Sequence, residues 1–368
     1  MKHLFLYSFI LIICLISCND RSENSELRPD GFQKKSGNPV YVIDNGFWGI
    51  SSSRQNSRAT TDGINHALAA AKAQGYTHIK LAPGEYQVQC TGNNRWVIPT
   101  DGILVPSGIT LDLTDTKIYL EPNDYICYGV IQLYRVSDVT IIGGHLVGDR
   151  YEHDFTNQQS RTHEYGHGIN IQGSSNITIK DMKIEGMTGD AIILTANGSN
   201  SFQENREQSC RNVLIDNCRL YDCRRQGISV VNAVDVEIRN NVIYNIHGTN
   251  PQFGIDVEPE VTYGAVAERI IIHHNQISDC VGGISFHGGT DSEAYENDIQ
   301  GLCLIAVFSQ RVKIYRNRVT GPGYISAGRG SAERPCQDIC IAMSGESANV
   351  AYMVNNSIQT GNFDCSYE

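Results

Sequence analysis

Short segments in which apolar and polar residues alternate recur along the chain from residue 129 onward. Each has an apolar residue, most often Ile, and a second apolar residue two positions later, the spacing expected of a strand with one buried face. Most of these strands are followed by a second strand and, after a polar corner, by a third. The first strands of the repeats fall at 129–134, 168–172, 191–195, 227–231, 254–258, 283–287, 304–308 and 338–342. Three short strands per repeat predict one coil of an all-β solenoid.

The corner between the second and third strands carries a separate signal. Asparagine stands two residues before an Ile or Val at five such corners, with successive spacings of 34, 22, 20 and 39 residues: Asn241, Asn275, Asn297, Asn317 and Asn356. Asparagine tolerates the left-handed backbone of a tight turn, and its amide can bond to the same residue one coil away. We therefore expect a ladder of stacked asparagines in left-handed turns, which separate turns in a β-sandwich would not produce.

An amphipathic helix is predicted ahead of the repeats, over residues 61–75, with Ile64, Ala67, Leu68 and Ala71 on one face. Such a helix covers the open N-terminal end of a solenoid. Without it, the edge strands would be free to pair with another chain and aggregate.

The asparagine corners, the helical segment 61–75 and the segment 79–86, in which Pro83-Gly84 turns out of a strand, resemble the pectate-lyase-like superfamily, also called the pectin-lyase fold. The resemblance extends roughly from residue 40 to residue 360. It implies a right-handed parallel β-helix with three short strands per coil and an N-terminal capping helix. It does not imply one activity, because a single fold carries many different sites.

The first 17 residues have the pattern of an export signal, since Lys2 precedes an apolar run that is too short to span a bilayer comfortably. The sequence Leu-Ile-Ser-Cys at 15–18 resembles the lipobox of bacterial lipoproteins, in which the cysteine is lipidated and becomes the new N-terminus. The resemblance implies a signal peptide over 1–17 and a lipid on Cys18. We therefore expect an exported protein that is anchored by a lipid at the outer membrane or the cell surface.

The remaining chain divides into a short polar stretch and one long domain. Residues 18–39 are rich in Ser, Asn, Asp and Glu and are interpreted as a flexible, solvated tether. Residues 40–368 are expected to form a single β-helix domain, and a monomer is expected rather than an oligomer. No second apolar run of membrane length follows the signal, so the lipid is the only membrane contact that the sequence predicts.

Composition narrows the function further. The chain is 40% hydrophobic and only 19% charged, which argues against disorder over most of its length. Its formal net charge is −11, from 29 basic and 40 acidic residues, so it has no strong basic field that could hold DNA or RNA. A nucleic acid is therefore not an expected partner.

The outward positions of the first strands carry the candidate chemistry. Adjacent coils lie about 4.8 Å apart and residues two apart along a strand about 6.6 Å apart, so Asp256, Glu258 and His287 should lie together. By the same alternation, the side chain of Arg225 should point outward one coil earlier. Two carboxylates side by side repel each other and would not be selected for stability alone. These four residues are the candidate catalytic residues.

Further polar residues extend the candidate site as substrate contacts. Three of them stand two residues before the strand Ile at a loop junction, two point outward from strand 168–172, and a tyrosine in the insertion after Glu260 could stack on a sugar ring. They are His167, Asp190, Gln226, Asn170, Gln172 and Tyr263.

Two of these residues lie in motifs that are similar to those of polygalacturonase-type hydrolases, Gly166-His-Gly168 and Gly189-Asp-Ala-Ile192. The order of the two motifs is reversed here, and Ala191 replaces the second aspartate. The catalytic roles of that family are therefore not transferred to this chain.

Two reactions fit a carboxylate pair at Asp256 and Glu258. In glycoside hydrolysis one carboxyl is a general acid with a raised pKa and the other activates water or attacks the sugar, without a cofactor. In a polysaccharide lyase, or a uronate epimerase, the pair would hold Ca²⁺ while Arg225 or His287 abstracts a proton. No lysine lies within 184–312, and the negative net charge would repel a polyanion, so the sequence favours hydrolysis.

A third interpretation belongs to another class. A β-helix can bind glycans without catalysis, as an adhesin, and a polar outer face is sufficient for that role. A polysaccharide or oligosaccharide is the expected partner in each case, and the sequence does not identify the sugar or the linkage.

Overall fold

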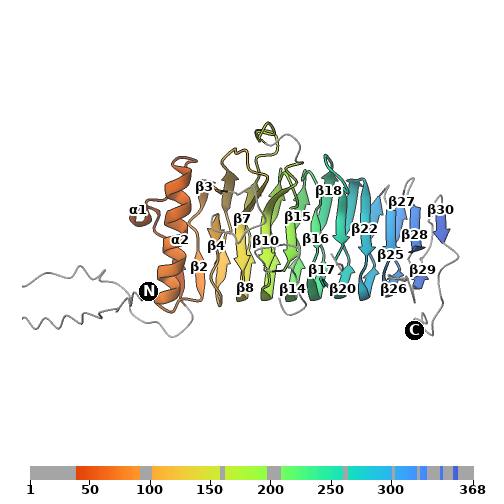
Figure 1. Cartoon of the computed structure of the whole chain (residues 1–368). Helices are drawn as coiled ribbons and strands as arrows, with labels where there is room; N and C mark the ends of the chain where they lie inside the picture. Colours follow the sequence, from red (N-terminus) through yellow and green to blue (C-terminus); the bar gives the residue numbers. More distant parts are fainter. Residues whose placement is uncertain are drawn as a thin grey trace, which may run out of the picture. The chain divides into compact units, whose positions relative to one another are not determined.

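The computed structural model describes residues 39–91, 102–157, 162–196, 209–259, 264–300, 303–320, 324–329, 340–342 and 351–354. Contacts within the chain separate residues 1–37 from residues 38–368, and all of the described residues belong to the second unit. That unit is a right-handed β-helix whose strands form three parallel sheets, stacked coil upon coil (Figure 1). The predicted fold class is therefore confirmed.

From β4 to β27, each coil contributes one strand to each sheet, in the order first, second and third. The first sheet contains β4 Ile103–Leu104, β7 Cys127–Tyr134, β10 Tyr165–Gln172, β13 Ile192–Thr195, β16 Ile228–Val230, β19 Phe253–Val257, β22 Gly282–His287, β25 Cys303–Val307, β28 Tyr324–Arg329 and β30 Ala351–Val354. The second contains β1 Val40–Val42, β2 His78–Lys80, β5 Thr110–Asp112, β8 Ser137–Ile142, β11 Ser175–Lys180, β14 Cys210–Asp216, β17 Ala233–Arg239, β20 Ala267–His273, β23 Thr290–Tyr295, β26 Gln310–Tyr315 and β29 Cys340–Ala342. The third contains β3 Gly84–Val88, β6 Thr116–Leu120, β9 His145–Val147, β12 Lys183–Glu185, β15 Arg219–Tyr221, β18 Val242–Ile246, β21 Gln276–Cys280, β24 Asp298–Gln300 and β27 Arg318–Thr320.

The core is built from columns of identical residues. Five strand isoleucines of the first sheet are fully buried and paired in register from coil to coil: Ile169, Ile192, Ile228, Ile255 and Ile284. Burial of each contributes about 1.5–3 kcal/mol. The glycine that often precedes this isoleucine is required by close packing, because a Cβ on Gly227 would lie 2.4 Å from the carbonyl oxygen of Gly254.

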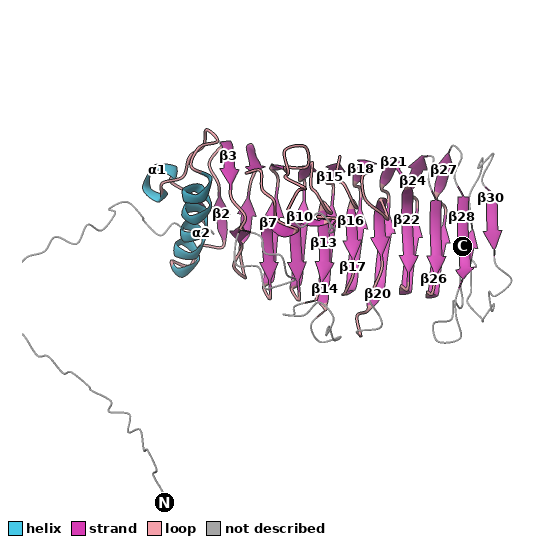
Figure 2. Ribbon diagram, turned by 45° about the horizontal axis from the view of Figure 1, so that its top comes forward, coloured by secondary structure: helices cyan, strands magenta, loops and turns pink. Residues whose placement is uncertain are grey.

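The predicted capping helix is present as α2 Ser57–Ala73, which begins four residues earlier and ends two residues earlier than the sequence suggested. Its apolar face is buried as expected, and α2 packs against β3 and β4 at the N-terminal end of the coils (Figure 2). The early start is stabilised by Thr61, whose hydroxyl donates to Ser57 O at 2.9 Å and accepts from Gln89 N–H at 2.8 Å. The short helix α1 Asn45–Trp48 precedes it. Within the described ranges, no helix is long and apolar enough to cross a membrane.

The asparagine ladder is present, but the prediction about its backbone is wrong. Asn241, Asn275 and Asn297 each donate from Nδ2 to Oδ1 of the asparagine in the next coil, at 2.9, 2.9 and 2.8 Å, and within the described residues the series extends to Asn317. The left-handed residue is the one before each ladder asparagine, such as Asn240 with φ 56°. The exposed preceding residue makes the turn, which lets the ladder amide point inward. Asn356 lies outside the described residues.

Two strand predictions near the C-terminal end are also wrong. Cys340–Ala342 pairs with β26 in the second sheet, whereas we expected a first strand at 338–342. The first-sheet strand of that coil is β28, in a stretch without a predicted strand. In addition, Ser285 pairs with Ile305, so the predicted alignment of 304–308 is displaced by one residue. Alternation identifies a strand, but it does not identify the sheet to which the strand belongs.

Candidate functional site

The candidate site lies on the face of the first sheet that points away from the core. Ser229, Asp256 and Ser285 are paired in register on β16, β19 and β22, and each stands between two core residues of its own strand. The alternation that buries Ile255 and Val257 therefore turns Asp256 to the outer face. Asp256 is nevertheless only 2% exposed.

Arg225 lies at the centre of the charged groups, and its side chain is on the outer face as the alternation predicted. Its Nη2 donates to Glu258 Oε1 at 2.7 Å, and its Nη1 lies 3.3 Å from Asp190 Oδ2 and 3.4 Å from Ser229 Oγ. The guanidinium therefore joins carboxylates from the coil before and the coil after its own. The side chains of Arg225 and Glu258 are 15% and 24% exposed, whereas Asp190 is fully buried beneath them.

Gln226 ties the two predicted catalytic carboxyls together. Its side-chain nitrogen, Nε2, lies 2.9 Å from Asp256 Oδ2 and 3.1 Å from Glu258 Oε1. Because both oxygens are bonded to one nitrogen, they can be no more than about 6 Å apart. The sequence identified Gln226 as a residue at the loop junction, and its position between the two carboxyls is new.

Burial determines the protonation of the two aspartates. It raises the pKa of Asp256 to about 8, with a further contribution from the negative charge of Glu258. Burial also raises the pKa of Asp190 to about 7, partly offset by the positive charge of Arg225. Burial of Arg225 lowers its pKa, but the charges of Asp190 and Glu258 outweigh this and raise it above its usual value. The site therefore combines a permanent cation with carboxyls that hold a proton near neutral pH.

His167 is held in its neutral form. Burial, and to a smaller extent the charge of Arg225, lowers the pKa of His167 to about 3. Its Nδ1 accepts a hydrogen bond of 3.2 Å from the backbone N–H of Asp190, so the ring proton is on Nε2. Nδ1 also lies 3.5 Å from Asp190 Oδ2, but a neutral imidazole makes no ion pair there. His167 therefore positions the Asp190 segment within the site.

Asn170 and Gln172 lie on β10, away from this cluster, whereas His287 follows Phe286, the register partner of Val257, on the strand next to that of Asp256. Asn170 is buried on β10, and Gln172 is half-buried at the end of that strand, where it pairs with Thr195. His287 is exposed, and its ring lies 5.1 Å from that of Phe308 in an edge-on arrangement. The proposed roles of these residues stay predictions, and Tyr263 and Cys18 lie outside the described residues.

A buried polar cluster near the start of the first-sheet strands was missed. Tyr128 on β7 donates from its hydroxyl to Asp149 Oδ1 at 2.6 Å, and Asp149 Oδ2 lies 2.8 Å from His153 Nδ1. His153 Nε2 lies 2.9 Å from His163 Nδ1. These contacts join irregular segments to β7. No periodic pattern could have revealed them, because Asp149, His153 and His163 lie outside the repeating strands.

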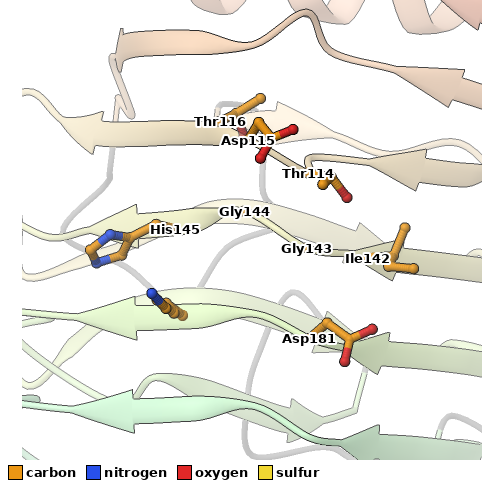
Figure 3. Close-up of a pocket in the computed structure, with 9 residues that line it drawn as sticks. Thr114, Asp115, Thr116, Ile142, Gly143, Gly144, His145 and Asp181 are labelled. Atoms are coloured by element: carbon orange, nitrogen blue, oxygen red, sulfur yellow. The ribbon is translucent and has the colours of Figure 1, made fainter.

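A shallow hollow of about 450 Å³ lies elsewhere, at the corners between the second and third sheets. Figure 3 shows its lining side chains, among them Asp115, His145 and Asp181. None of the residues predicted to act in catalysis or substrate binding lines it. In the described part of the chain, no group of three or more His, Cys, Asp or Glu side chains is arranged to hold a metal ion.

Comparisons with known sequences support the fold. A family model described as a right-handed β-helix region matches residues 207–366. The SPβ prophage-derived uncharacterized protein YorA of Bacillus subtilis is 27% identical over 333 residues, which cover 87% of this chain and 55% of that protein. The uncharacterized protein YclG of the same organism is 32% identical over 226 residues, or 59% of this chain and 38% of its own length. The chain thus spans about half or less of these relatives.

Solved structures share the fold at low sequence identity. The surface adhesin PfbA of Streptococcus pneumoniae superimposes with a TM-score of 0.64 and 15% identity, covering 87% of this chain and 83% of that one. A tailspike protein of E. coli bacteriophage HK620, in complex with a pentasaccharide, has a TM-score of 0.60 and 11% identity, covering 87% and 58%. An endo-xylogalacturonan hydrolase from Aspergillus tubingensis has a TM-score of 0.54 and 11% identity, covering 87% and 90%. At these identities the likeness concerns the fold alone.

Proposed function

We propose a function from the chain's own site, because its right-handed β-helix fold is shared by adhesins, tailspikes and hydrolases. We propose that it is a glycoside hydrolase that cleaves a polysaccharide or oligosaccharide at Asp256 and Glu258. The observation that carries the proposal is the bridge from Gln226 Nε2 to Asp256 and Glu258, at 2.9 and 3.1 Å. It fixes two carboxyls side by side on one outer face.

The separation of the two carboxyls favours a retaining mechanism. Retaining glycosidases place their carboxyl groups about 5–5.5 Å apart, whereas inverting enzymes need about 6.5–9.5 Å to admit a water molecule. The upper limit of about 6 Å between Asp256 Oδ2 and Glu258 Oε1, the two oxygens that share Gln226 Nε2, is compatible with the first range. The pair is therefore suited to direct attack by a carboxylate on the sugar.

The surroundings assign different roles to the two groups. Asp256 is buried with its pKa raised to about 8, so it holds a proton at neutral pH and can serve as the general acid. Glu258 is paired with the Arg225 guanidinium, 2.7 Å from its Oε1. Arg225 and Gln226 both donate to Oε1 of Glu258. Among the described residues, Oε2 accepts no hydrogen bond, and we assign it as the attacking oxygen.

The proposed reaction has two steps. The proton of Asp256 passes to the glycosidic oxygen as that bond breaks, and Glu258 Oε2 forms a bond to the anomeric carbon. The Asp256 carboxylate then takes a proton from water, and the resulting hydroxyl displaces Glu258 from the sugar. Asp256 regains its proton, Glu258 regains its negative charge, and the configuration at the anomeric carbon is retained.

The residues do not fit the calcium-dependent alternative. Glu258 Oε1 lies 2.7 Å from the Arg225 guanidinium, a cation that would oppose Ca²⁺ binding at the same carboxylate. Arg225 is also a poor base for proton abstraction, because Asp190 and Glu258 raise its pKa. We therefore derive no lyase or epimerase step from this site.

A glycan panel distinguishes hydrolysis from the two alternatives, elimination and non-catalytic glycan binding. The wild-type protein is expected to release new reducing ends without the ultraviolet absorbance of an unsaturated product, and Glu258→Gln is expected to bind the same glycan without cleaving it. Unsaturated product would overturn the proposal in favour of elimination. Binding without cleavage by the wild-type protein would overturn it in favour of a non-catalytic glycan binder.

We also propose that the enzyme works outside the cytoplasm. The basic and apolar start of the chain and the Leu-Ile-Ser-Cys sequence ending at Cys18 support export and lipid attachment. Polymeric glycans are found outside the cell, so this location would bring the site to its substrate.

A further inference from the structure

Two amides stand next to each other on the outer face of the first sheet, on the N-terminal side of the proposed reaction centre. Gln132 on β7 and Asn170 on β10 are partners in register. They are only 5% and 8% exposed. Along the same row, Asn170 is followed by Ile193, Ser229 and Asp256 on successive strands. Three strand steps, or about 14 Å, therefore separate Asn170 from the general acid.

Each of the two amides has a buried oxygen without a hydrogen bond. Gln132 Oε1 and Asn170 Oδ1 have no partner among the described residues. The orientation of Gln132 is fixed, because its Nε2 donates to Gly129 O at 3.2 Å. Gln226 Oε1, next to the carboxyl pair, also lacks a partner. Asp256 Oδ1 is a fourth such oxygen on this face. Buried polar groups are nearly always hydrogen-bonded, so the unpartnered acceptors of the amides indicate that a donor belongs there.

The chemistry of these atoms selects the kind of sugar. A carbonyl oxygen can only accept, so it binds the hydroxyl of a sugar and cannot bind a carboxylate. Arg225, a cation on this face, is already shared between Glu258 and Asp190. Among the described residues of this cluster, the carboxylate of a uronate would therefore meet acceptor oxygens at the two amides and the acidic groups Glu258 and Asp190 at the reaction centre, where the charge of Arg225 is already paired.

We infer that Gln132 and Asn170 form a subsite that binds the hydroxyl groups of an uncharged sugar, so that the substrate is a neutral glycan lying across the strands of the first sheet. That the bound glycan is a substrate rests on the proposed function. That it binds at Gln132 and Asn170 rests on the two amides themselves. The buried oxygens are retained at a cost in stability because they bind the substrate.

Stability gives a test that needs no substrate. Asn170→Leu removes an unpartnered oxygen and keeps the approximate volume, so it is expected to raise the thermal midpoint by about 2 °C or more. Gln132→Met also removes the hydrogen bond from Nε2 to Gly129 O, so it is expected to raise the midpoint by less. Asn241→Leu is the matched control. It makes the same change where the amide is fully bonded in the ladder, and it should lower the midpoint. A lower midpoint in both Asn170→Leu and Gln132→Met would mean a structural role and would overturn the inference.

Binding gives the second test, in the full chain carrying Glu258→Gln so that no turnover intervenes. The probes are cellohexaose, xylohexaose and mannohexaose as neutral glycans, and hexagalacturonate as the anionic one. At least one neutral probe is expected to bind, and Asn170→Leu and Gln132→Met should each weaken it about tenfold. Binding of hexagalacturonate alone, binding of no neutral probe, or unchanged affinity in both variants would contradict the inference.

The two proposals can fail separately. If a neutral probe binds through Asn170 but the wild-type chain does not cleave it, the hydrolase proposal fails and the subsite stands. If the wild-type chain cleaves a neutral probe while Asn170→Leu and Gln132→Met bind it normally, the subsite fails and the hydrolase proposal stands.

Discussion

Arg225 donates a hydrogen bond of 2.7 Å to Glu258 Oε1, across one step of the coil. The same guanidinium lies 3.3 Å from Asp190, so one cation orients a half-exposed carboxylate and partly neutralises a buried one. Arginine suits this position, because its planar group can contact two carboxyls at once while its charge persists at any working pH. The proposed nucleophile is thus oriented by a residue that is far from it in the sequence.

Replacing Arg225 should affect the rate more than the fold. Arg225→Lys keeps the charge but cannot reach both carboxyls, and kcat is expected to fall about 100-fold as Glu258 loses its orientation. Arg219→Met is a suitable control, because Arg219 contacts Tyr244 on the third sheet and takes no part in the site. Steady-state kinetics on a cleaved glycan would check this. An unchanged kcat in Arg225→Lys would remove Arg225 from the mechanism.

The buried aspartates predict an unusual dependence of stability on pH. An aspartate in the unfolded chain loses its proton near pH 3.9, whereas Asp256 in the folded protein keeps its proton to about pH 8. Between these values the folded state binds the extra proton, so raising the pH lowers the free energy of unfolding by about 1.4 kcal/mol per pH unit for this group. Above pH 8 its contribution to the slope disappears.

Urea unfolding at a series of pH values from 5 to 9 would measure this slope. Asp256→Asn is neutral at every pH and should make the slope smaller by about one proton, and Asp190→Asn should reduce it further below about pH 7. Identical slopes for the wild-type protein and Asp256→Asn would show that Asp256 is ionised in the folded protein at neutral pH. That result would remove its assignment as the general acid.

The asparagine ladder should be a major source of stability. Asn275 donates from Nδ2 to Ile238 O and Asn297 Oδ1, both at 2.9 Å, and its Oδ1 accepts from Asn241. Asn275→Ala leaves these buried groups without partners and should lower the free energy of unfolding by about 2–4 kcal/mol.

An exposed asparagine pair provides the control for this prediction. Asn212 Nδ2 donates to Asn176 Oδ1 at 2.9 Å on the surface. Because Asn212 has a left-handed backbone with φ 51°, glycine is the suitable replacement, and Asn212→Gly should change the free energy of unfolding by less than about 0.5 kcal/mol. Chemical denaturation would compare the two variants. Equal losses in both would show that burial of the ladder is not the source of its effect.

The proposed lipid attachment at Cys18 can be tested by fractionation. Cys18→Ala removes the residue that would carry the lipid, so the variant should leave the membrane fraction and should not incorporate labelled fatty acid. Cys90→Ala leaves the lipobox intact, and the protein should remain in the membrane fraction and keep the label. Label on Cys18→Ala would contradict the lipid attachment proposed at Cys18.

The repeating part of the molecule was predictable from the sequence because its geometry is regular. Alternation gives the direction of a side chain and the coil gives its neighbours, which is why Arg225, Asp256 and Glu258 were placed together. The hydrogen bonds of Gln226 to both carboxyls were harder to predict, since they depend on a side-chain conformation just before a strand begins. The buried contact between His153 and Asp149 could not be predicted from the sequence, because the two residues lie in an irregular segment.

The sequence failed where its pattern was compatible with two arrangements. The strand Cys340–Ala342 alternates equally well in either sheet, so the pattern did not reveal that it belongs to the second sheet. Likewise, outward parity suggested an accessible Asp256, whereas the side chain is buried. Solvent accessibility depends on the groups that lie over a strand, and the alternation along the strand gives only the direction of its side chains.

The anomeric configuration of the first product tests the central claim most directly. Proton NMR during cleavage of a glycan should show that the newly formed reducing end first appears with the configuration of the bond that was broken, and only later mutarotates. Glu258→Gln should form this product at least about 10³-fold more slowly. Initial appearance of the inverted anomer, or an unaffected rate in Glu258→Gln, would contradict the assignment of Asp256 and Glu258 as a retaining pair.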